Sequence, residues 1–164
     1  MTPPLVLDAC CGGRMFWFDK KDPRACFVDN REYENKVVNN NGKKPRLFSV
    51  KPDMLMDFRK MNIESDQYAL VVFDPPHLRR KDLNAKYSTR YYGALDPKTW
   101  REDLRAGFKE CFRVLKPQGT LIFKWCETEI PLKDILALTP EKPLFGHRSG
   151  KASKTHWVAF IKSL

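Results

Sequence analysis

The sequence lacks several features that would place the protein in a membrane or in an oxidising compartment. No apolar run approaches the roughly 18 residues that a membrane-spanning helix requires, and residues 1–4 lead directly into a strand-like segment instead of a signal peptide. The cysteines number five, and no two of them have the CxxC spacing of zinc or thioredoxin-like sites. We therefore expect a cytoplasmic protein with free thiols, no membrane partner and no metal.

Acidic residues are too few to balance the basic ones. The chain has 30 lysines and arginines against 20 aspartates and glutamates, a formal charge of +10. A surplus of this size favours polyanionic partners such as DNA or RNA, and the alternative is a basic domain that is merely soluble. The 164 residues contain no internal repeat, low-complexity tract or linker, which predicts a single domain over residues 1–164.

Strand-like runs alternate with helical or loop segments, which is typical of an α/β sheet protein. The expected strands are residues 5–8, 25–29, 54–56, 70–73 and 120–125, followed by two closing strands at 145 and 155–161. Only a short helix of about two turns, over residues 14–20, fits between the first two strands. The Asn-Gly pair within residues 39–42 predicts a β-hairpin or a long loop in the region 30–50.

One longer helix is expected after the fourth strand. Asp96 and Pro97 suit its N-cap and its first position. Apolar residues then recur on one helical face until residues 116–119, Lys-Pro-Gln-Gly, end it. A second, short helix is expected over residues 131–138.

An acidic residue stands at the end of each of four expected strands: Asp8, Asp29, Asp57 and Asp74. Because the ends of parallel strands meet at one edge of an open sheet, where ligands bind, we expect these carboxylates to converge. Carboxylates can accept the hydroxyls of a ribose or the amine of adenine, and Gly12 lets the backbone approach a ligand closely. The set therefore suits a nucleoside, although each acid alone could be a helix cap.

Residues 74–77, Asp-Pro-Pro-His, are the sharpest local signal in the chain. Tandem prolines cannot continue a β-ladder, so they end the strand in a stiff turn where the Asp74 carboxylate and the Pro75 carbonyl can point at one place. Two acceptors suit an exocyclic amine, which has two hydrogens to donate. The imidazole of His77 could stack on a base. An ordinary strand-terminating turn is the alternative interpretation.

These motifs together resemble class I S-adenosylmethionine-dependent methyltransferases, specifically the compact phage or bacterial enzymes that methylate adenine N6 at an (Asp/Asn)-Pro-Pro-aromatic motif. The resemblance covers nearly the whole chain. It implies a Rossmann-like, mostly parallel sheet with an antiparallel closing strand, in which the helices after the first two strands are shortened in this sequence. The residues that it assigns to the cofactor S-adenosylmethionine are Asp8, Cys10, Gly12, Asp29, Asp57 and Phe58. The residues that it assigns to catalysis are Asp74, Pro75, Pro76 and His77.

Four departures from that family pattern are visible, and the first is the shortening of the helices after the first two strands. Arg14 stands where the family usually has a second glycine of the cofactor loop, and His77 replaces the usual Tyr, Phe or Trp. Imidazole can still stack, but it is smaller and can titrate. No segment is large enough for a separate target-recognition domain, so we expect a partner subunit or a homodimer to supply target recognition.

Two basic segments are candidate contacts for nucleic acid. Residues 78–93 interleave cations with tyrosines directly after the Asp-Pro-Pro-His turn, a composition typical of loops that bind phosphates and bases. Residues 146–151 superficially resemble a phosphate-binding P-loop, but a spacer residue is missing, which excludes ATP binding there. The residues expected to contact the substrate are Arg79, Arg80, Lys81, Arg90, His147, Arg148 and Lys151. A solvated loop and a tight turn are the alternatives.

The leading functional hypothesis is methyl transfer to adenine N6 of DNA. Adenine N6 of RNA and cytosine N4 remain open, because the motif recognises an amine and does not name the ring. From another class, the chain could be a catalytically inactive, nucleic-acid-binding subunit of the same fold. A small-molecule or protein amine is disfavoured by the basic charge.

Overall fold

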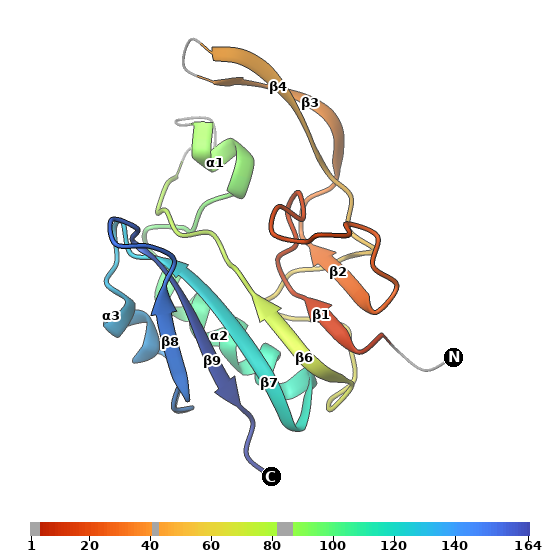
Figure 1. The fold of residues 1–164 in the computed structure, drawn as a ribbon, viewed down its shortest axis with the longest axis vertical. Helices are drawn as coiled ribbons and strands as arrows, with labels where there is room; N and C mark the ends of the chain where they lie inside the picture. The colour runs from red at the N-terminus through yellow and green to blue at the C-terminus, as the bar shows by residue number, and fades with distance from the viewer. Residues whose placement is uncertain (1–3, 41–42, 82–86) are drawn as a thin grey trace.

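The computed structural model describes residues 4–40, 43–81 and 87–164. A seven-stranded twisted sheet forms the centre of the molecule (Figure 1). In spatial order its strands are β5 (Met54–Leu55), β2 (Ala25–Asp29), β1 (Val6–Asp8), β6 (Tyr68–Phe73), β7 (Leu115–Cys126), β9 (Thr155–Ile161) and β8 (Phe145–Arg148). The first five strands run parallel, and β9 and β8 add antiparallel pairs. The expected mostly parallel sheet with an antiparallel closing strand is confirmed.

One face of the sheet is covered by α2 (Trp100–Val114), which lies behind β6 and β7 in Figure 1. The apolar face of this helix packs ring against ring on the strands: the centroid of Phe108 lies 5.4 Å from that of Phe73 and 4.9 Å from that of Phe123. Alternate residues of β7, including Leu121, Phe123 and Trp125, are fully buried on this side. The apolar residues that alternate along β7 and those that recur on one face of α2 therefore pack together in one core.

The opposite face is partly covered by the segment that follows β1. The Trp17 ring packs edge-on against Phe27 of β2 at 4.9 Å, and the Phe16 ring packs edge-on against Trp157 of β9 at 5.5 Å. The helix expected over residues 14–20 is wrong, because this segment forms turns. Arg14 has a φ of 53°, a left-handed conformation that does not continue a right-handed helix. Two consecutive aromatic side chains then both pack on the sheet.

The region 30–50 forms a β-hairpin of β3 (Tyr33–Asn40) and β4 (Lys43–Val50), as one of the two alternatives predicted. Its Asn41-Gly42 turn lies outside the described residues. The hairpin and α1 (Tyr87–Tyr92) stand beyond the carboxyl ends of β1, β2 and β6 in Figure 1. The rings of Phe48 and Tyr91, 3.7 Å apart between centroids, join the two.

Three element boundaries differ from those expected. β5 is a two-residue strand at the sheet edge, with Leu55 58% exposed, and so is not a core strand. α2 begins at Trp100 and not at Asp96, because the Asp96 carboxylate accepts from the Lys98 N–H in a turn that precedes the helix. Residues 116–119 belong to β7, which starts as soon as α2 ends.

The remaining helix is short. α3 (Leu132–Leu136) lies within the expected range 131–138. No helix in the described residues is long and apolar enough to cross a membrane.

Candidate active site

A pocket of about 480 Å³ opens beyond the carboxyl ends of β1, β2 and β6. The chain runs from β1 outward through β2 to β5, and then resumes on the other side of β1 with β6 and β7. Ligands bind at such a reversal of strand order in open α/β sheets. The volume lies in the range of small-molecule sites. Its walls come from the turns after β1 (residues 9–13), β2 (29–31) and β6 (74–77), and from residues 92–96.

The turn after β1 brings its backbone into the pocket wall. Gly12 has a φ of 47°, a left-handed conformation that glycine adopts without a steric penalty. Its N–H donates to Asp29 Oδ2 at 2.9 Å, which ties the turn to the end of β2. Cys10 also lines the pocket. The structure therefore brings together three of the residues expected to bind the cofactor.

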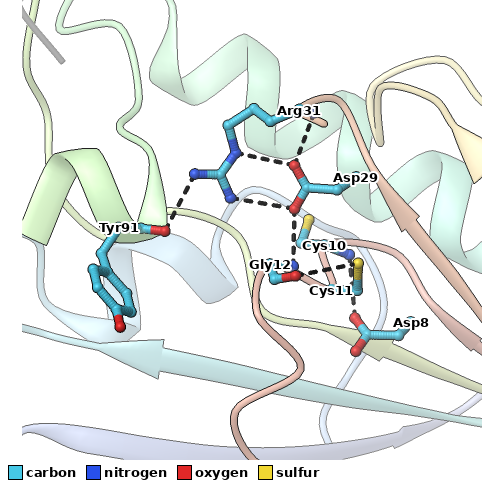
Figure 2. A network of polar contacts seen from close by, with 7 residues as sticks. All are labelled: Asp8, Cys10, Cys11, Gly12, Asp29, Arg31 and Tyr91. Carbon is cyan, nitrogen blue, oxygen red and sulfur yellow. Dashed lines mark hydrogen bonds and ion pairs between the residues drawn. The ribbon is translucent and has the colours of Figure 1, made fainter. Parts of the chain in front are cut away.

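Asp29 is held by a network that Figure 2 shows, centred on Arg31. Asp29 Oδ1 accepts from the backbone N–H and from Nε of Arg31, both at 3.0 Å, and Oδ2 accepts from a terminal nitrogen of Arg31 at 3.2 Å and from Gly12. The other terminal nitrogen of Arg31 donates to the carbonyl of Tyr91 at 3.3 Å. Arg31 thus joins the ribose-binding candidate Asp29 to α1, and a ligand hydroxyl at Asp29 has to share or displace its guanidinium.

Asp8 lies beneath the pocket and does not line it. Its side chain is fully buried, with Oδ2 accepting from Trp17 Nε1 at 2.7 Å and Oδ1 accepting from the Cys10 N–H at 3.3 Å. Burial outweighs these two hydrogen bonds and raises the pKa of Asp8 from 3.8 to about 7. Asp8 is therefore a partner of the turn that lines the pocket.

Asp74 follows the carboxyl end of β6 and lies between two basic side chains. Lys124 Nζ, from β7, donates to Asp74 Oδ2 at 2.7 Å. His77 Nε2 lies 3.0 Å from Asp74 Oδ1, without the alignment of a hydrogen bond. Burial acts to raise the pKa of Asp74, but His77 and Lys124 outweigh it and hold the pKa below 3.8. The catalytic candidate is therefore a carboxylate at neutral pH.

The His77 ring is fixed as well. It packs edge-on against Trp125, with centroids 4.9 Å apart and planes at 86°. Its Nδ1 is buried without a hydrogen-bond partner among the described residues. The imidazole lines the pocket beside Pro75 and Pro76, so all four residues of the Asp-Pro-Pro-His turn meet there.

The expected convergence of four carboxylates is only half correct. Asp29 and Asp74 line the pocket, whereas Asp57 turns back to Arg59, whose Nε donates to it at 2.9 Å. Burial acts to raise the pKa of Asp57, but hydrogen bonds from Arg59 outweigh it and lower the pKa. Phe58 does line the pocket, as expected of an adenine-binding residue.

The expected substrate contacts lie in two places. Arg79 and Arg80 both pair with Glu129, so their charges are partly balanced. Lys81 is exposed, and the side chain of Arg90 lies outside what the structure describes. The other three, His147 and Arg148 of β8 and Lys151 of the following turn, are exposed and do not line this pocket.

Several pocket residues were not found from the sequence: Met15, Phe16, Arg31, Lys124, Cys126 and Thr155. A signal existed for Lys124, because it is a charged residue inside an otherwise apolar strand. No comparable signal marked Arg31. Among the described residues, no three His, Cys, Asp or Glu side chains are grouped so as to hold a metal ion.

Comparisons with known proteins were informative only at the level of structure. No family model matches the sequence, and no curated protein matches it. A protein from Pyrococcus horikoshii superposes with a TM-score of 0.58 at 15% identity, over 96% of this chain and 81% of its own. An S-adenosylmethionine-dependent methyltransferase from Methanosarcina mazei gives 0.54 at 10% identity, over 97% and 92%. The chain has the class I methyltransferase fold.

The structure of a third neighbour contains the demethylated form of the cofactor. This 1,6-didemethyltoxoflavin-N1-methyltransferase from Burkholderia thailandensis, with bound S-adenosylhomocysteine, gives a TM-score of 0.51 at 13% identity over 99% of this chain and 72% of its own. These neighbours agree with the cofactor expected from the sequence, S-adenosylmethionine. Their fold does not select a substrate, since the Burkholderia enzyme acts on a small molecule.

Proposed function

We propose that the protein uses S-adenosylmethionine to methylate the exocyclic amine of a nucleic-acid base, with adenine N6 of DNA as the leading substrate. The observation that carries this proposal is the position of the Asp-Pro-Pro-His turn. It shares one pocket with the Gly12 turn and Asp29, at the reversal of strand order. An acceptor for an amine therefore lies beside the groups suited to a nucleoside cofactor.

The residues of the pocket fit that cofactor. Asp29 stands where the ribose hydroxyls would bind, Phe58 would contact the adenine, and the turn of residues 9–13 would approach the methionine part. His77 Nδ1 is a buried polar atom without a hydrogen-bond partner among the described residues, and Asp74 Oδ1 has only its ion-pair contact with His77 Nε2. Buried polar atoms ordinarily form hydrogen bonds. When bound, S-adenosylmethionine supplies a methyl group already activated on a sulfonium.

The work left to the chain is alignment of a weak nucleophile and stabilisation of charge. Lys124 and His77 keep Asp74 ionised, so its carboxylate can accept a hydrogen from the substrate amine. The carbonyl of Pro75 is the second acceptor in this proposal. Positive charge that grows on the nitrogen during transfer is stabilised by Asp74, and the amine proton then leaves to water.

A nucleic-acid substrate is supported by the charge of the chain and by the segment next to the pocket. The formal charge is +10, and Tyr92 together with residues 93–96 lines the pocket wall. Adenine N6 of RNA and cytosine N4 present the same amine chemistry. A catalytically inactive, nucleic-acid-binding subunit is the second candidate, favoured by the four donors that already surround Asp29.

The test is transfer of a labelled methyl group from S-adenosylmethionine to DNA, RNA and protein in parallel, followed by nucleoside analysis. We expect label in DNA as N6-methyladenine. Calorimetry with S-adenosylhomocysteine separates the two candidates, because an inactive subunit that has lost its cofactor site shows no binding. Cofactor binding together with label in protein alone would contradict the nucleic-acid assignment.

A further inference from the structure

A second hollow, of about 310 Å³, lies next to the candidate active site. Its walls are the end of β7, the start of the segment leading to α3 and the turn between β8 and β9. Three basic residues line it, Arg148, Lys151 and Lys154, together with Ser153 and one acidic residue, Glu127. This lining is predominantly basic and polar, which suits an anion.

The one carboxylate in the hollow is already engaged. Glu127 Oε1 lies 3.0 Å from a terminal nitrogen of Arg148 and 2.9 Å from His156 Nε2, and Oε2 accepts from the Leu132 N–H. Glu127 therefore fixes Arg148 and balances its charge. In the part of the chain that the structure describes, Lys151 and Lys154 form no ion pair, so their charges remain available to a ligand.

Ser153 adds a directional donor. Its Oγ accepts from the Thr155 N–H at 3.0 Å, which fixes the side chain and leaves the hydroxyl hydrogen free to donate. A hydroxyl and two ammonium groups around one cavity are the groups that proteins use to bind phosphate oxygens of nucleic acids.

The hollow and the active-site pocket are joined through one strand pair. Cys126 and Thr155, which face each other across β7 and β9, line the pocket. The next residues, Glu127 and Lys154, line the hollow, and the Glu127 N–H donates to the Lys154 carbonyl at 2.9 Å. The two cavities are thus lined by adjacent residues of the same two chain segments. A chain of nucleotides that leaves the pocket can therefore enter the hollow directly.

We propose that this hollow is a phosphate subsite, which holds a backbone phosphate next to the nucleotide whose base enters the pocket. This inference rests on the proposed function, because it takes the ligand of the pocket to be part of a polynucleotide. It assigns Lys151, Ser153 and Lys154 to one phosphate, with Arg148 as the fixed wall. The subsite positions the strand and carries no sequence information, since phosphate contacts do not distinguish bases.

The experiment measures binding of a single-stranded 12-mer of thymidines with one central adenine, by fluorescence anisotropy at low salt. A series of such oligonucleotides carries one uncharged methylphosphonate at successive positions around the adenine. They are compared on the parental protein, on Lys151→Ala/Lys154→Ala, and on the control Lys109→Ala/Lys116→Ala. The control lysines are exposed on α2 and at the opposite end of β7, and they give the same change in charge.

A methylphosphonate at one of these positions should weaken binding to the parental protein by about tenfold, the scale of one lost contact to a charged group. The Lys151→Ala/Lys154→Ala protein should bind the unmodified strand about tenfold more weakly than the parental protein does. The methylphosphonate at that position should then reduce its affinity by less than about twofold more. The control protein should keep the full positional effect. Equal sensitivity at every position, an unchanged positional effect in Lys151→Ala/Lys154→Ala, or no binding at all would overturn the subsite.

The assay does not require methyl transfer. A strand that binds with the expected positional pattern but is never methylated supports the subsite, and then only the proposed function fails. A strand that is methylated without the positional pattern overturns the subsite alone.

Discussion

Two carboxyl groups at neighbouring strand ends differ in their protonation at neutral pH, because their partners differ. Asp74 has a lysine and a histidine beside it, and its pKa lies below 3.8. Asp8, at the end of the adjacent strand, has only the neutral donors Trp17 Nε1 and the Cys10 N–H, and burial raises its pKa to about 7. One acid is therefore ready to accept a hydrogen bond at neutral pH while the other is about half protonated.

This difference predicts how stability depends on pH. The raised pKa means that the folded protein binds a proton at Asp8 that the unfolded chain, with a pKa near 3.8, has already lost. Asp8 should therefore reduce the free energy of unfolding as pH rises from about 4 to about 7, with no further change above that. Between pH 5 and 8 the free energy of unfolding of the parental protein should fall by about 2–3 kcal/mol relative to that of Asp8→Asn, given that pKa difference.

Urea unfolding of both proteins at several pH values measures this. Carboxylates with lowered pKa values, such as Glu110 and Glu129, affect stability only at lower pH and are common to both proteins. A parental-minus-Asp8→Asn difference that stays constant from pH 5 to 8 would show that Asp8 is already ionised in the folded state.

Strand-end acids were predictable residue by residue, and their partners were not. A carboxylate after a buried apolar run marks a strand end from the sequence alone, and Asp29 and Asp74 do line the pocket. Arg31 and Arg59 each stand two residues after an acid. A guanidinium at that spacing can fold back or reach into solvent, and only the finished fold decides between these. The position of Asp57 outside the pocket therefore could not be foreseen.

At the scale of elements, the approach of α2 to the sheet depends on a glycine. A Cβ added at Gly107 would lie 2.6 Å from Phe73 Cζ and 2.7 Å from Phe58 Cδ2, closer than packed carbon atoms allow. Phe73 is fully buried and Phe58 lines the pocket. The helix thus supports the pocket wall through this contact.

Gly107→Ala should accordingly destabilise the protein. Alanine favours the helix by up to about 1 kcal/mol, but overpacking of a filled core costs about 1–3 kcal/mol, so we expect a net loss of about 1–2 kcal/mol in urea unfolding. Gly150→Ala is the matched control, because a Cβ there has 4.0 Å to its nearest neighbour. If Gly107→Ala is as stable as the parental protein, α2 does not pack against β6 as closely as the structure shows.

Elements with a strong period were predictable, and elements set by tertiary contacts were not. The buried strands and the apolar face of α2 follow from residue spacing. The segment 14–20 has the length of a short helix, yet Phe16 and Trp17 instead cover separate strands of the sheet. Asp96-Pro97 suits a helix start and equally suits the turn that is found three residues before α2.

At the scale of the whole molecule, the site lies where the sheet topology places it. The order of strands reverses between β1 and β6, so the Gly12 turn and the Asp-Pro-Pro-His turn must be neighbours. The β3–β4 hairpin and α1 stand on the same side (Figure 1). The basic hollow adjoins the pocket at the end of β7. Cofactor, target base and flanking phosphate would thus share one edge of the sheet.

The central claim, that Asp74 accepts from the reacting amine, is tested most directly by Asp74→Ala in single-turnover methyl transfer, with cofactor affinity measured by calorimetry on the same sample. Asp134→Ala, which removes an exposed acid on α3, is the control and should match the parental rate. We predict that Asp74→Ala binds S-adenosylhomocysteine nearly as tightly as the parental protein, while transfer to the base falls at least about a hundredfold. A fully active Asp74→Ala protein would contradict the assignment of the catalytic turn.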